Sequence, residues 1–377
     1  MALALAAGAC LLAACGSGSG TAAAPAGAAL QQQLDHLVAM PGGPPGAIAT
    51  VQIGNRVRTE TAGVGDTAGD QPITLDDTFR IASVSKAYNG AVALALVSQG
   101  RLSLDDTIGK WLPDLPRSWW PVTLAQLLQH TSGVPDYITS PAFVAQLKAD
   151  PTQYLSPTQI LGFVTDEPLA FEPPGSRYEY SDSENIVVGL MAEAAAGATY
   201  DALLHQEVYG PLGLTATSLP DTVDLPEPYV RGYDVEAGQP PTDVSLFINP
   251  ALAWASGGMI ATPAELNTFI RAYARGALVD PSTRARQRTW VAGESGPAGP
   301  GTNSAGLGIY RYRTSCGTLY GATGNYPGYT TFAAATPDGS RSTVVMVNTQ
   351  VNTKSSNGEY AALRQAWSDA ACDALGR

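Results

Sequence analysis

Charged side chains are scarce in this chain, and basic ones are the scarcer kind. Asp, Glu, Lys and Arg make up 14% of the 377 residues, whereas an ordinary soluble domain has about 25%. The 33 acidic and 21 basic residues give a net charge of −12, and no basic cluster interrupts that balance. A negative chain is repelled by phosphate backbones and anionic head groups. The composition therefore argues against nucleic acid as a partner and against electrostatic attachment to a membrane.

Metal-binding side chains are also few. The only histidines are His36, His130 and His205, and the sequence contains neither a His-x-x-x-His nor a Cys-x-x-Cys pair. Metal sites in proteins use such closely spaced ligands. We therefore expect no metal and no cofactor.

The first 34 residues carry no charge at all. Residues 2–14 are a short apolar stretch, too short to span a bilayer core of about 30 Å, and the run LAAC at 12–15 forms a lipobox. This pattern predicts a lipoprotein signal peptide at 1–14, lipidation of Cys15, a flexible Gly/Ser/Ala tether at 15–33 and a folded domain at 34–377. The protein would be extracytoplasmic, held at the cell membrane by its lipid alone. The usual basic start of a signal is missing, so an upstream start or an unusual signal stays open.

Two cysteines remain once Cys10 is assigned to the signal and Cys15 to the lipid. An even pair in an exported chain favours a disulfide between Cys316 and Cys372. The alternative is two unpaired buried thiols.

Turn residues are abundant, with 40 Gly and 28 Pro. Residues 47–53 and 56–61 flank Gly54-Asn55 as a hairpin would, and 329–335 and 342–348 flank a second turn. Residues 359–375 are typical of a terminal helix. Strands at both ends with helices between them predict an α/β fold: an antiparallel sheet built from both termini, flanked by helices, with a mainly helical insertion at about 101–250.

The run FRIASVSK at 79–86 places Ser83 and Lys86 three residues apart at the start of an almost wholly apolar helix. Helix geometry puts such a pair on one face. A buried lysine loses preference for its charge, so it can accept a proton from a serine. Alone, the spacing is a weak signal, because a capping serine followed by a solvated lysine gives the same pattern.

Further segments strengthen the signal. LLQHTSGVPDY at 127–137, PGSRYEYSD at 174–182, SGGMIAT at 256–262 and YGATGNYPGY at 320–329 follow in order. Together with the Ser-x-x-Lys step they resemble the penicillin-recognising serine hydrolases, the family of class C beta-lactamases, D,D-carboxypeptidases and family VIII esterases. The resemblance covers roughly residues 45 to 350 and implies the beta-lactamase/transpeptidase-like fold, with the active site between sheet and helices.

The resemblance implies roles for individual residues. Ser83 would be the nucleophile, with Lys86 and Tyr180 sharing the proton transfers. The main-chain N–H groups of Ser83 and Asn325 would form the oxyanion hole. The remaining segments would bind substrate through Asp182, Ala322, Thr323 and Gly324.

Two positions depart from the family pattern. Asp182 stands where the family often has Asn, and Ala322 stands where it usually has Lys or His. A carboxylate at 182 would hydrogen-bond near Lys86 and shift the base role toward Tyr180, or it would merely cap a helix beginning near Ser183. Whether Lys86 or Tyr180 is the base stays open.

His130 invites a Ser-His-Asp triad, which we reject. The chain contains no Gly-x-Ser-x-Gly elbow, and His130 follows a short predicted helix at 124–128, where histidines bind backbone carbonyls. We expect it to be structural.

These patterns predict a lipid-anchored serine hydrolase that acts through an acyl-enzyme on a small ester, peptide or beta-lactam. The rival hypothesis is a non-catalytic cell-wall or penicillin-binding protein on the same scaffold, suggested by Asp182 and Ala322. A monomer is expected.

Overall fold

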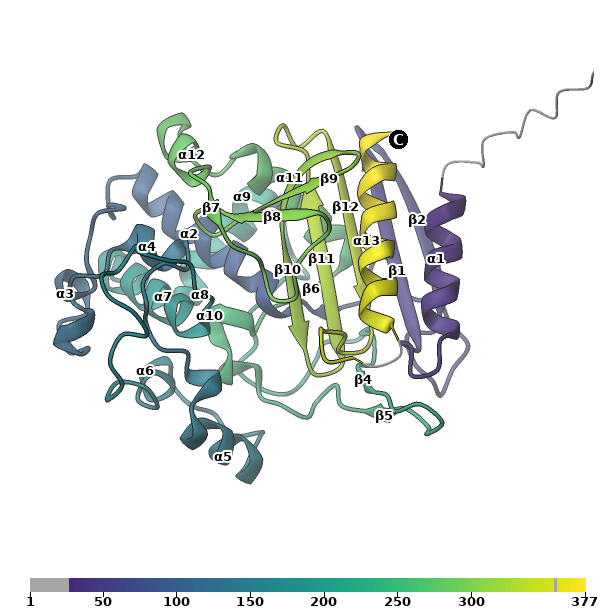
Figure 1. Cartoon of the computed structure of the whole chain (residues 1–377), viewed down its shortest axis with the longest axis horizontal. Helices are drawn as coiled ribbons and strands as arrows, with labels where there is room; N and C mark the ends of the chain where they lie inside the picture. The colour runs from purple at the N-terminus through teal and green to yellow at the C-terminus, as the bar shows by residue number, and fades with distance from the viewer. Residues whose placement is uncertain (1–26, 356–357) are drawn as a thin grey trace, which may run out of the picture.

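Eight strands form one antiparallel sheet at the centre of the computed structural model, which describes residues 27–355 and 358–377 (Figure 1). Their order is β2-β1-β12-β11-β10-β9-β8-β7, so the first hairpin lies beside the last strand. This confirms the prediction that one sheet joins the two ends of the chain. The strands are β1 (Gly46–Ile53), β2 (Arg56–Gly63), β7 (Val291–Ala292), β8 (Thr302–Ala305), β9 (Tyr310–Thr314), β10 (Gly317–Tyr326), β11 (Tyr329–Ala335) and β12 (Arg341–Val347).

Helices fill the long interval between β2 and β7 and are also found at both ends of the described chain. They are α1 (Ala28–Ala39), α2 (Ser85–Ser98), α3 (Ile108–Trp111), α4 (Leu124–Leu128), α5 (Pro141–Ala149), α6 (Pro157–Leu161), α7 (Asp182–Ala196), α8 (Tyr200–Leu204), α9 (Gly210–Leu212), α10 (Trp254–Gly257), α11 (Pro263–Arg275), α12 (Pro281–Gln287) and α13 (Glu359–Leu375).

Short segments link these helices. They are the 3-10 turns η1 (Ala82–Val84), η2 (Arg117–Trp119), η3 (Tyr137–Thr139) and η5 (Pro250–Leu252), the π-helical turn η4 (His205–Tyr209), and two small strand pairs, β3 (Phe79–Arg80) with β6 (Ile260–Ala261) and β4 (Tyr233–Asp234) with β5 (Thr242–Asp243).

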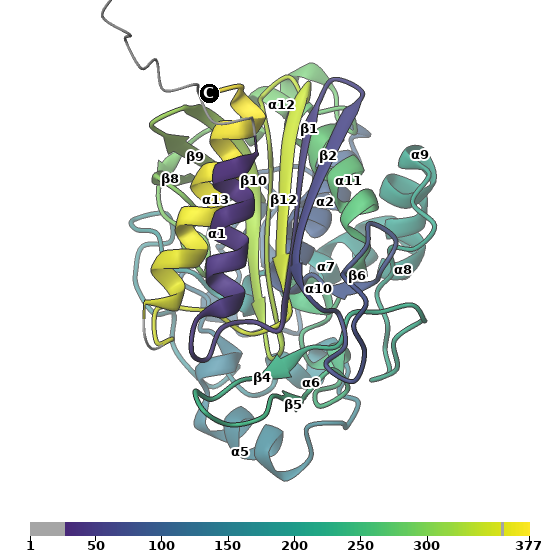
Figure 2. The same ribbon diagram turned by 90° about the vertical axis from the view of Figure 1, so that its right-hand side faces the viewer.

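The two terminal helices cover one face of the sheet. Figure 2 shows α1 and α13 side by side over the strands, with α11 and α2 behind them. Strand β1 shows why the sheet is buried on both sides: Ala47, Ala49 and Val51 pack toward the terminal helices, and Ile48 between them packs toward the helical region. Successive side chains of a strand point to opposite faces, so an apolar run of this kind is covered twice.

Helix α2 lies in the middle of the protein. Every residue from Ser85 to Leu96 is buried, as expected of a helix that is apolar on all sides. Burial of the whole helix carries the Lys86 side chain out of solvent, where its charge must find partners.

Several local predictions are confirmed. The two hairpins and the terminal helix form where the sequence placed them, and Cys316 and Cys372 form a disulfide with a Cα–Cα distance of 5.2 Å. The bond ties α13 to the turn between β9 and β10. Within the described ranges, no single helix is long and apolar enough to cross a bilayer; one pair, α7 with Tyr200–Leu212, reaches the required length together but is bent by 84°.

Two boundaries differ from the sequence-based prediction. Helix α1 begins at Ala28, inside the segment expected to be tether, because Leu30 and Leu34 are fully buried under α13 and belong to the core. Helices also continue past residue 250 as α10, α11 and α12, which pack on the sheet and on α2. Residues 1–26, including Cys15, lie outside the described part of the chain.

Candidate active site

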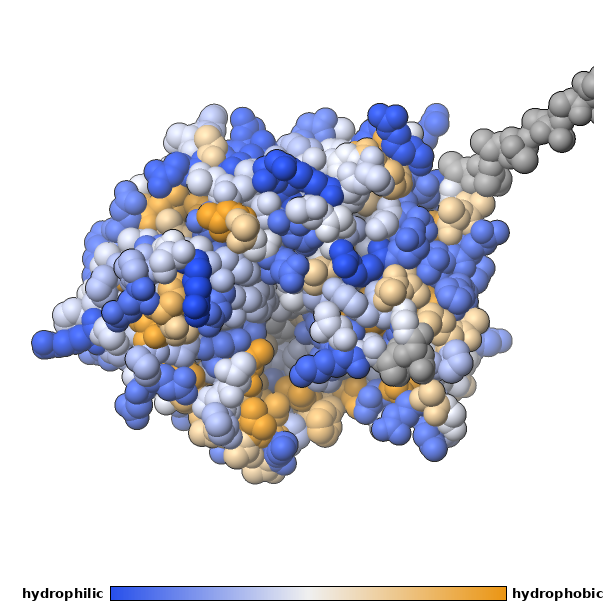
Figure 3. Space-filling model, in the orientation of Figure 1, coloured by the Kyte–Doolittle hydropathy of each residue, from blue (hydrophilic) through white to orange (hydrophobic). Residues whose placement is uncertain are grey.

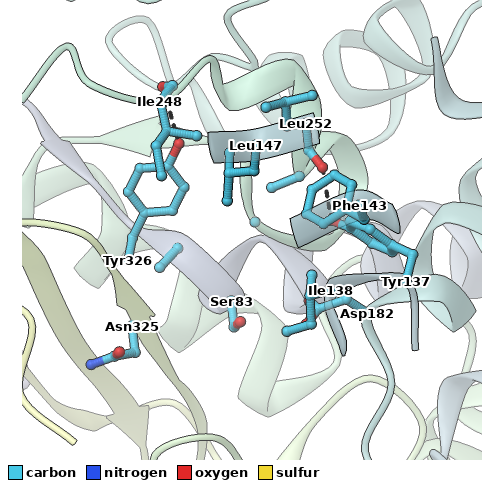
Figure 4. Close-up of a pocket in the computed structure, with 13 residues that line it drawn as sticks. Ser83, Tyr137, Ile138, Phe143, Leu147, Asp182, Ile248, Leu252, Asn325 and Tyr326 are labelled. Atoms are coloured by element: carbon cyan, nitrogen blue, oxygen red, sulfur yellow. Dashed lines mark hydrogen bonds between the residues drawn. The ribbon is translucent and has the colours of Figure 1, made fainter. Parts of the chain in front are cut away.

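Ser83 lies in η1, the 3-10 turn that connects β3 to α2. The preceding residue, Ala82, has a φ of 51°, a left-handed conformation that a residue with a Cβ rarely adopts. Such strain is often found at functional sites. The turn projects the serine into a pocket rather than into the first turn of α2 (Figure 4).

Strand β10 runs closely past this turn. A Cβ added to Gly324 would lie 2.3 Å from the carbonyl oxygen of Ile81 and 3.1 Å from the main-chain nitrogen of Ser83, so only glycine fits here. The next residue, Asn325, directs its side chain away from Ser83 and donates to Thr330 Oγ1 and to the Val351 carbonyl. Only the main chain of Asn325 therefore remains to serve a substrate at this edge.

Lys86 is surrounded by three acceptors. Its Nζ lies 3.0 Å from Ser83 Oγ, 2.5 Å from Asp182 Oδ1 and 2.7 Å from the Ser256 carbonyl oxygen. An ammonium has three N–H donors, which this set of acceptors matches one for one. The resting site is thus arranged around a charged lysine paired with a carboxylate, and the expected contact between Asp182 and Lys86 is present.

Tyr180 lies over the same lysine, with Lys86 Nζ 4.8 Å from its ring centroid. Burial raises the pKa of Tyr180 well above its usual value, and the charge of Asp182 adds to this, while the Ser83 hydroxyl acts in the opposite direction. The resting tyrosine is therefore a neutral phenol. Asp182 opposes ionisation of Tyr180 as well, so its carboxylate does not simply transfer the base role to tyrosine, as the sequence suggested.

A second carboxyl group lies behind Asp182. The main-chain N–H of Asp182 donates to Asp136 Oδ1 over 3.1 Å. Burial, together with the charge of Asp182, raises the pKa of Asp136 to about 8, although Lys86 opposes the shift. Asp136 is therefore protonated at neutral pH. No pattern near Asp136 indicates this role, because the shift arises from burial and from Asp182, which is distant in the chain.

We predict that Asp136→Asn flattens the pH dependence of stability. Because the pKa of Asp136 is higher in the folded than in the unfolded chain, the folded protein loses stability as pH rises from about 4 to about 8, by at most about 1.4 kcal/mol per pH unit. Urea unfolding at pH 5, 6, 7 and 8 should show this slope in the wild type and a smaller one in the variant. Asp105→Asn, at an exposed carboxyl, is the control. Equal slopes in wild type and Asp136→Asn would contradict the prediction.

His130 has a different partner from the backbone carbonyls that the sequence predicted. It follows α4 with a φ of 56°, and its Nδ1 contacts Glu184 Oε2 rather than backbone carbonyls. The ring stacks on Tyr180. The sequence missed Glu184, because its side chain is brought to His130 only by the packing of α7 against α4.

The pocket in front of Ser83 has a volume of about 150 Å³ and largely apolar walls. Figure 3 shows a hollow near the middle of this face with apolar residues along its lower rim. Asp182 is the only ionisable carboxyl group among the lining residues, and no Lys or Arg is among them. The side chains that surround Ser83 in this pocket are Tyr137, Ile138, Phe143, Leu147, Ile248, Leu252 and Tyr326.

A smaller cavity lies on the other side of Ser83, where Ala322 and Thr323 line the wall together with His130 and Tyr180. Ala322 is buried, and Thr323 Oγ1 donates to the Pro297 carbonyl over 2.6 Å. Lys86 is the only Lys or Arg that lines either cavity. Arg311, a candidate for a replacement cation on the neighbouring strand β9, instead stacks over Trp290 and donates to Ser304.

The protein-family comparison agrees with this geometry. The model of the family described as beta-lactamase matches residues 30–366. The chain belongs to the beta-lactamase family. It therefore has the serine hydrolase scaffold of that family. In the part of the chain that the structure describes, no three His, Cys, Asp or Glu side chains are grouped to hold a metal ion.

Solved structures of this fold include amide hydrolases. The D-stereospecific amidohydrolase from a Streptomyces species is 32% identical and superposes with a TM-score of 0.77 over 86% of this chain and 95% of its own. The D-amino acid amidase from Ochrobactrum anthropi SV3, solved with D-phenylalanine, is 24% identical, with a TM-score of 0.78 over 90% of this chain and 97% of its own. At 24% identity, the similarity to the amidase shows a shared fold and nothing further.

One relative of this chain is a peptidase. The D-alanyl-D-alanine-carboxypeptidase/endopeptidase AmpH of Escherichia coli is 28% identical over 53% of this chain and 49% of its own length. Penicillin-binding protein 4* of Bacillus subtilis is 25% identical over 50% of this chain and 41% of its own. The chain thus matches less than half the length of these two relatives.

The structure brings most of the predicted site residues of this family member together. Ser83, Tyr180 and Asp182 all lie around Lys86, and Gly324 packs against the serine turn. The Ser256 carbonyl and the carboxyl groups of Asp136 and Glu184 also belong to the site, although the sequence analysis assigned them no role. The carbonyl could not have been found from the sequence, since any residue type supplies one.

Proposed function

We propose that this chain is a serine hydrolase that forms an acyl-enzyme on Ser83 and acts on amides and esters of amino acids with an apolar side chain. The observation that carries the proposal is the hydrogen bond between Lys86 Nζ and Ser83 Oγ at the edge of an apolar pocket. A nucleophile within hydrogen-bonding reach of its proton acceptor is the basic requirement for this chemistry.

Acylation begins when Ser83 Oγ attacks the substrate carbonyl and gives up its proton to the Lys86 and Tyr180 pair. In the resting site Lys86 is an ammonium and Tyr180 is a neutral phenol, so neither can accept the serine proton. The pair must therefore lose a proton before Ser83 attacks. Protonation of the leaving amine or alcohol by the same pair breaks the scissile bond, and water then releases the acyl group from Ser83.

The main-chain N–H groups of Ser83 and Asn325 would hold the oxyanion of the tetrahedral intermediate. Two features support this assignment. Gly324 lets strand β10 approach the serine turn, and the Asn325 side chain is occupied elsewhere. Strand β10 would fix the Asn325 donor and the turn η1 would fix the Ser83 donor, which avoids reorganisation during the reaction.

The apolar pocket would hold the side chain of the acyl group, and the Asp182 carboxylate at its wall would face a substrate ammonium. A side chain the size of phenylalanine suits the aromatic and aliphatic walls. Among the described residues, only Lys86 donates to the Asp182 carboxylate, which leaves its second oxygen for the substrate. The names of the Streptomyces and Ochrobactrum structures suggest D-configured substrates.

The rival function, a binding protein without turnover, requires a damaged catalytic set. What speaks against it is that Ser83 and Tyr180 both lie against Lys86. The departures at positions 182 and 322 alter the surroundings of this set and leave the set itself in place.

We also propose that Cys15 carries a diacylglyceryl group and anchors the enzyme outside the cytoplasm. The LAAC run and the Gly/Ser-rich segment after it support this, and a disulfide suits an oxidising compartment. Mass spectrometry of the N-terminal peptide from the native host should show cleavage before residue 15 and the lipid. A mature protein that starts elsewhere and carries no lipid would refute the anchor.

Hydrolysis of matched amides tests the substrate class. We expect D-phenylalanine amide to be hydrolysed faster than its L-enantiomer, and N-acetyl-D-phenylalanine amide to be slower because it lacks the ammonium. If the protein hydrolyses esters but acts on all three amides at equal rates, the proposed substrate class is refuted. The acyl-enzyme mechanism on Ser83 would still hold. No turnover of any amide or ester would refute the function itself.

A further inference from the structure

A buried polar cluster lies directly behind Tyr180. It consists of His130, Ser132 and Glu184, which are 4%, 0% and 0% exposed. Glu184 Oε2 contacts His130 Nδ1, and Glu184 Oε1 accepts a hydrogen bond of 2.5 Å from Ser132 Oγ. Both carboxylate oxygens are therefore held, and one of them is directed at the imidazole.

The imidazole in turn packs on the tyrosine. The rings of His130 and Tyr180 stack with centroids 4.6 Å apart and planes inclined by 25°. The His130 carbonyl also accepts a hydrogen bond of 2.8 Å from the N–H of Glu179, which fixes the main chain next to Tyr180. The Ser83 hydroxyl is the polar group that acts on the buried Tyr180 hydroxyl, but it forms no well-aligned hydrogen bond with it within residues 27–355 and 358–377. Ring packing therefore contributes to the orientation of the phenol.

Burying this polar cluster is energetically unfavourable compared with burying apolar side chains of the same size. A buried carboxylate must give up its hydration, and a well-packed apolar set is usually as stable or more so. His130 also adopts a left-handed conformation that a non-glycine residue disfavours. An apolar ring against Tyr180 would provide packing alone, whereas Glu184 fixes the rotation of the imidazole and hence the surface on which Tyr180 lies.

We propose that Glu184 and His130 form a positioning pair that holds the Tyr180 phenol over Lys86 and Ser83. The pair acts through the tyrosine and does not touch the substrate carbonyl. The inference rests on the proposed function, since it assigns the pair to the proton-transfer step of acylation. Without the pair, the phenol samples other orientations, so the chemical step slows while substrate binding is unchanged.

The test uses the double variant His130→Phe/Glu184→Gln, which keeps an aromatic ring, leaves no buried unpaired charge and removes the link between the two residues. Because Tyr180 is retained, we expect kcat for a p-nitrophenyl ester to fall about tenfold with KM within about twofold. Fluorophosphonate labelling of Ser83 should slow by the same factor. His205→Phe is the control, because His205 also makes a ring contact with a tyrosine, Tyr209, but away from the site. It should retain wild-type kinetics.

A double-mutant cycle separates positioning from general destabilisation. In a Tyr180→Phe background, adding His130→Phe/Glu184→Gln should cause no further loss of rate, because the group that the pair positions is gone. If the double variant folds poorly, Glu184→Gln alone is used, because it preserves the shape of the side chain. Adding Glu184→Gln to Tyr180→Phe should then also cause no further loss of rate. Wild-type kcat in the folded variants, or full additivity with Tyr180→Phe, overturns the proposal. If the wild type neither turns over esters nor is labelled, the proposed function has failed instead.

Discussion

Ser83→Ala should lower turnover of short-chain p-nitrophenyl esters by about a thousandfold or more, because it removes the only atom that can form the acyl-enzyme. The melting temperature should stay close to the wild-type value. A single hydroxyl at the edge of a pocket contributes little to packing, and Lys86 retains its contacts with Asp182 and Ser256. Initial rates and thermal unfolding of the same preparation measure both effects.

Ser98→Ala is the matched control for this substitution. Ser98 lies at the far end of α2, where its hydroxyl donates to the Leu94 carbonyl and accepts from the Asp280 N–H. Its loss should affect stability more than activity. If Ser83→Ala keeps more than a few per cent of the wild-type rate, Ser83 is not the nucleophile.

Ala322→His should shift specificity toward substrates that carry a carboxylate by about ten- to a hundredfold. Related carboxypeptidases and beta-lactamases usually have Lys or His at this motif position, whereas alanine offers neither charge nor hydrogen bond. One charge-assisted hydrogen bond contributes about 1.5 to 3 kcal/mol, and every 1.4 kcal/mol is about tenfold. We therefore expect the wild type to prefer neutral esters and amides over penicillins and D-alanyl-D-alanine peptides.

The ratio of kcat/KM for nitrocefin to that for a p-nitrophenyl ester measures this shift. Ala322→Leu adds volume without a donor, so it should leave the ratio unchanged or lower both rates. Arg311 cannot replace the missing cation, because it is held by Trp290 and Ser304 outside both cavities. Efficient nitrocefin hydrolysis by the wild type, or an unchanged ratio in Ala322→His, would mean that Ala322 does not set specificity.

The elements that the sequence predicted well are those with local signals. The first hairpin follows from a two-residue turn with Gly54 at φ 59°, and α13 follows from an uninterrupted run without Gly or Pro. The start of α1 could not be predicted in this way. Its first turns contain the same alanines as the segment before them, and only burial of Leu30 and Leu34 against α13 draws them into the fold.

The same distinction holds at the site. Ser83 and Lys86 are three residues apart, so helical geometry alone predicts their contact. Asp136 and Glu184 acquire their roles from partners 46 and 54 residues away. No pattern near either residue reports that contact, because it depends on how α7 packs against the segments that follow α4.

Intact-mass analysis after reaction with a fluorophosphonate tests the central claim most directly. The account predicts one adduct per chain, mapped to the peptide that contains Ser83, with no adduct in Ser83→Ala and normal labelling in Ser98→Ala. A chain that stays unmodified, or one modified at another serine, would contradict an acyl-enzyme mechanism on Ser83.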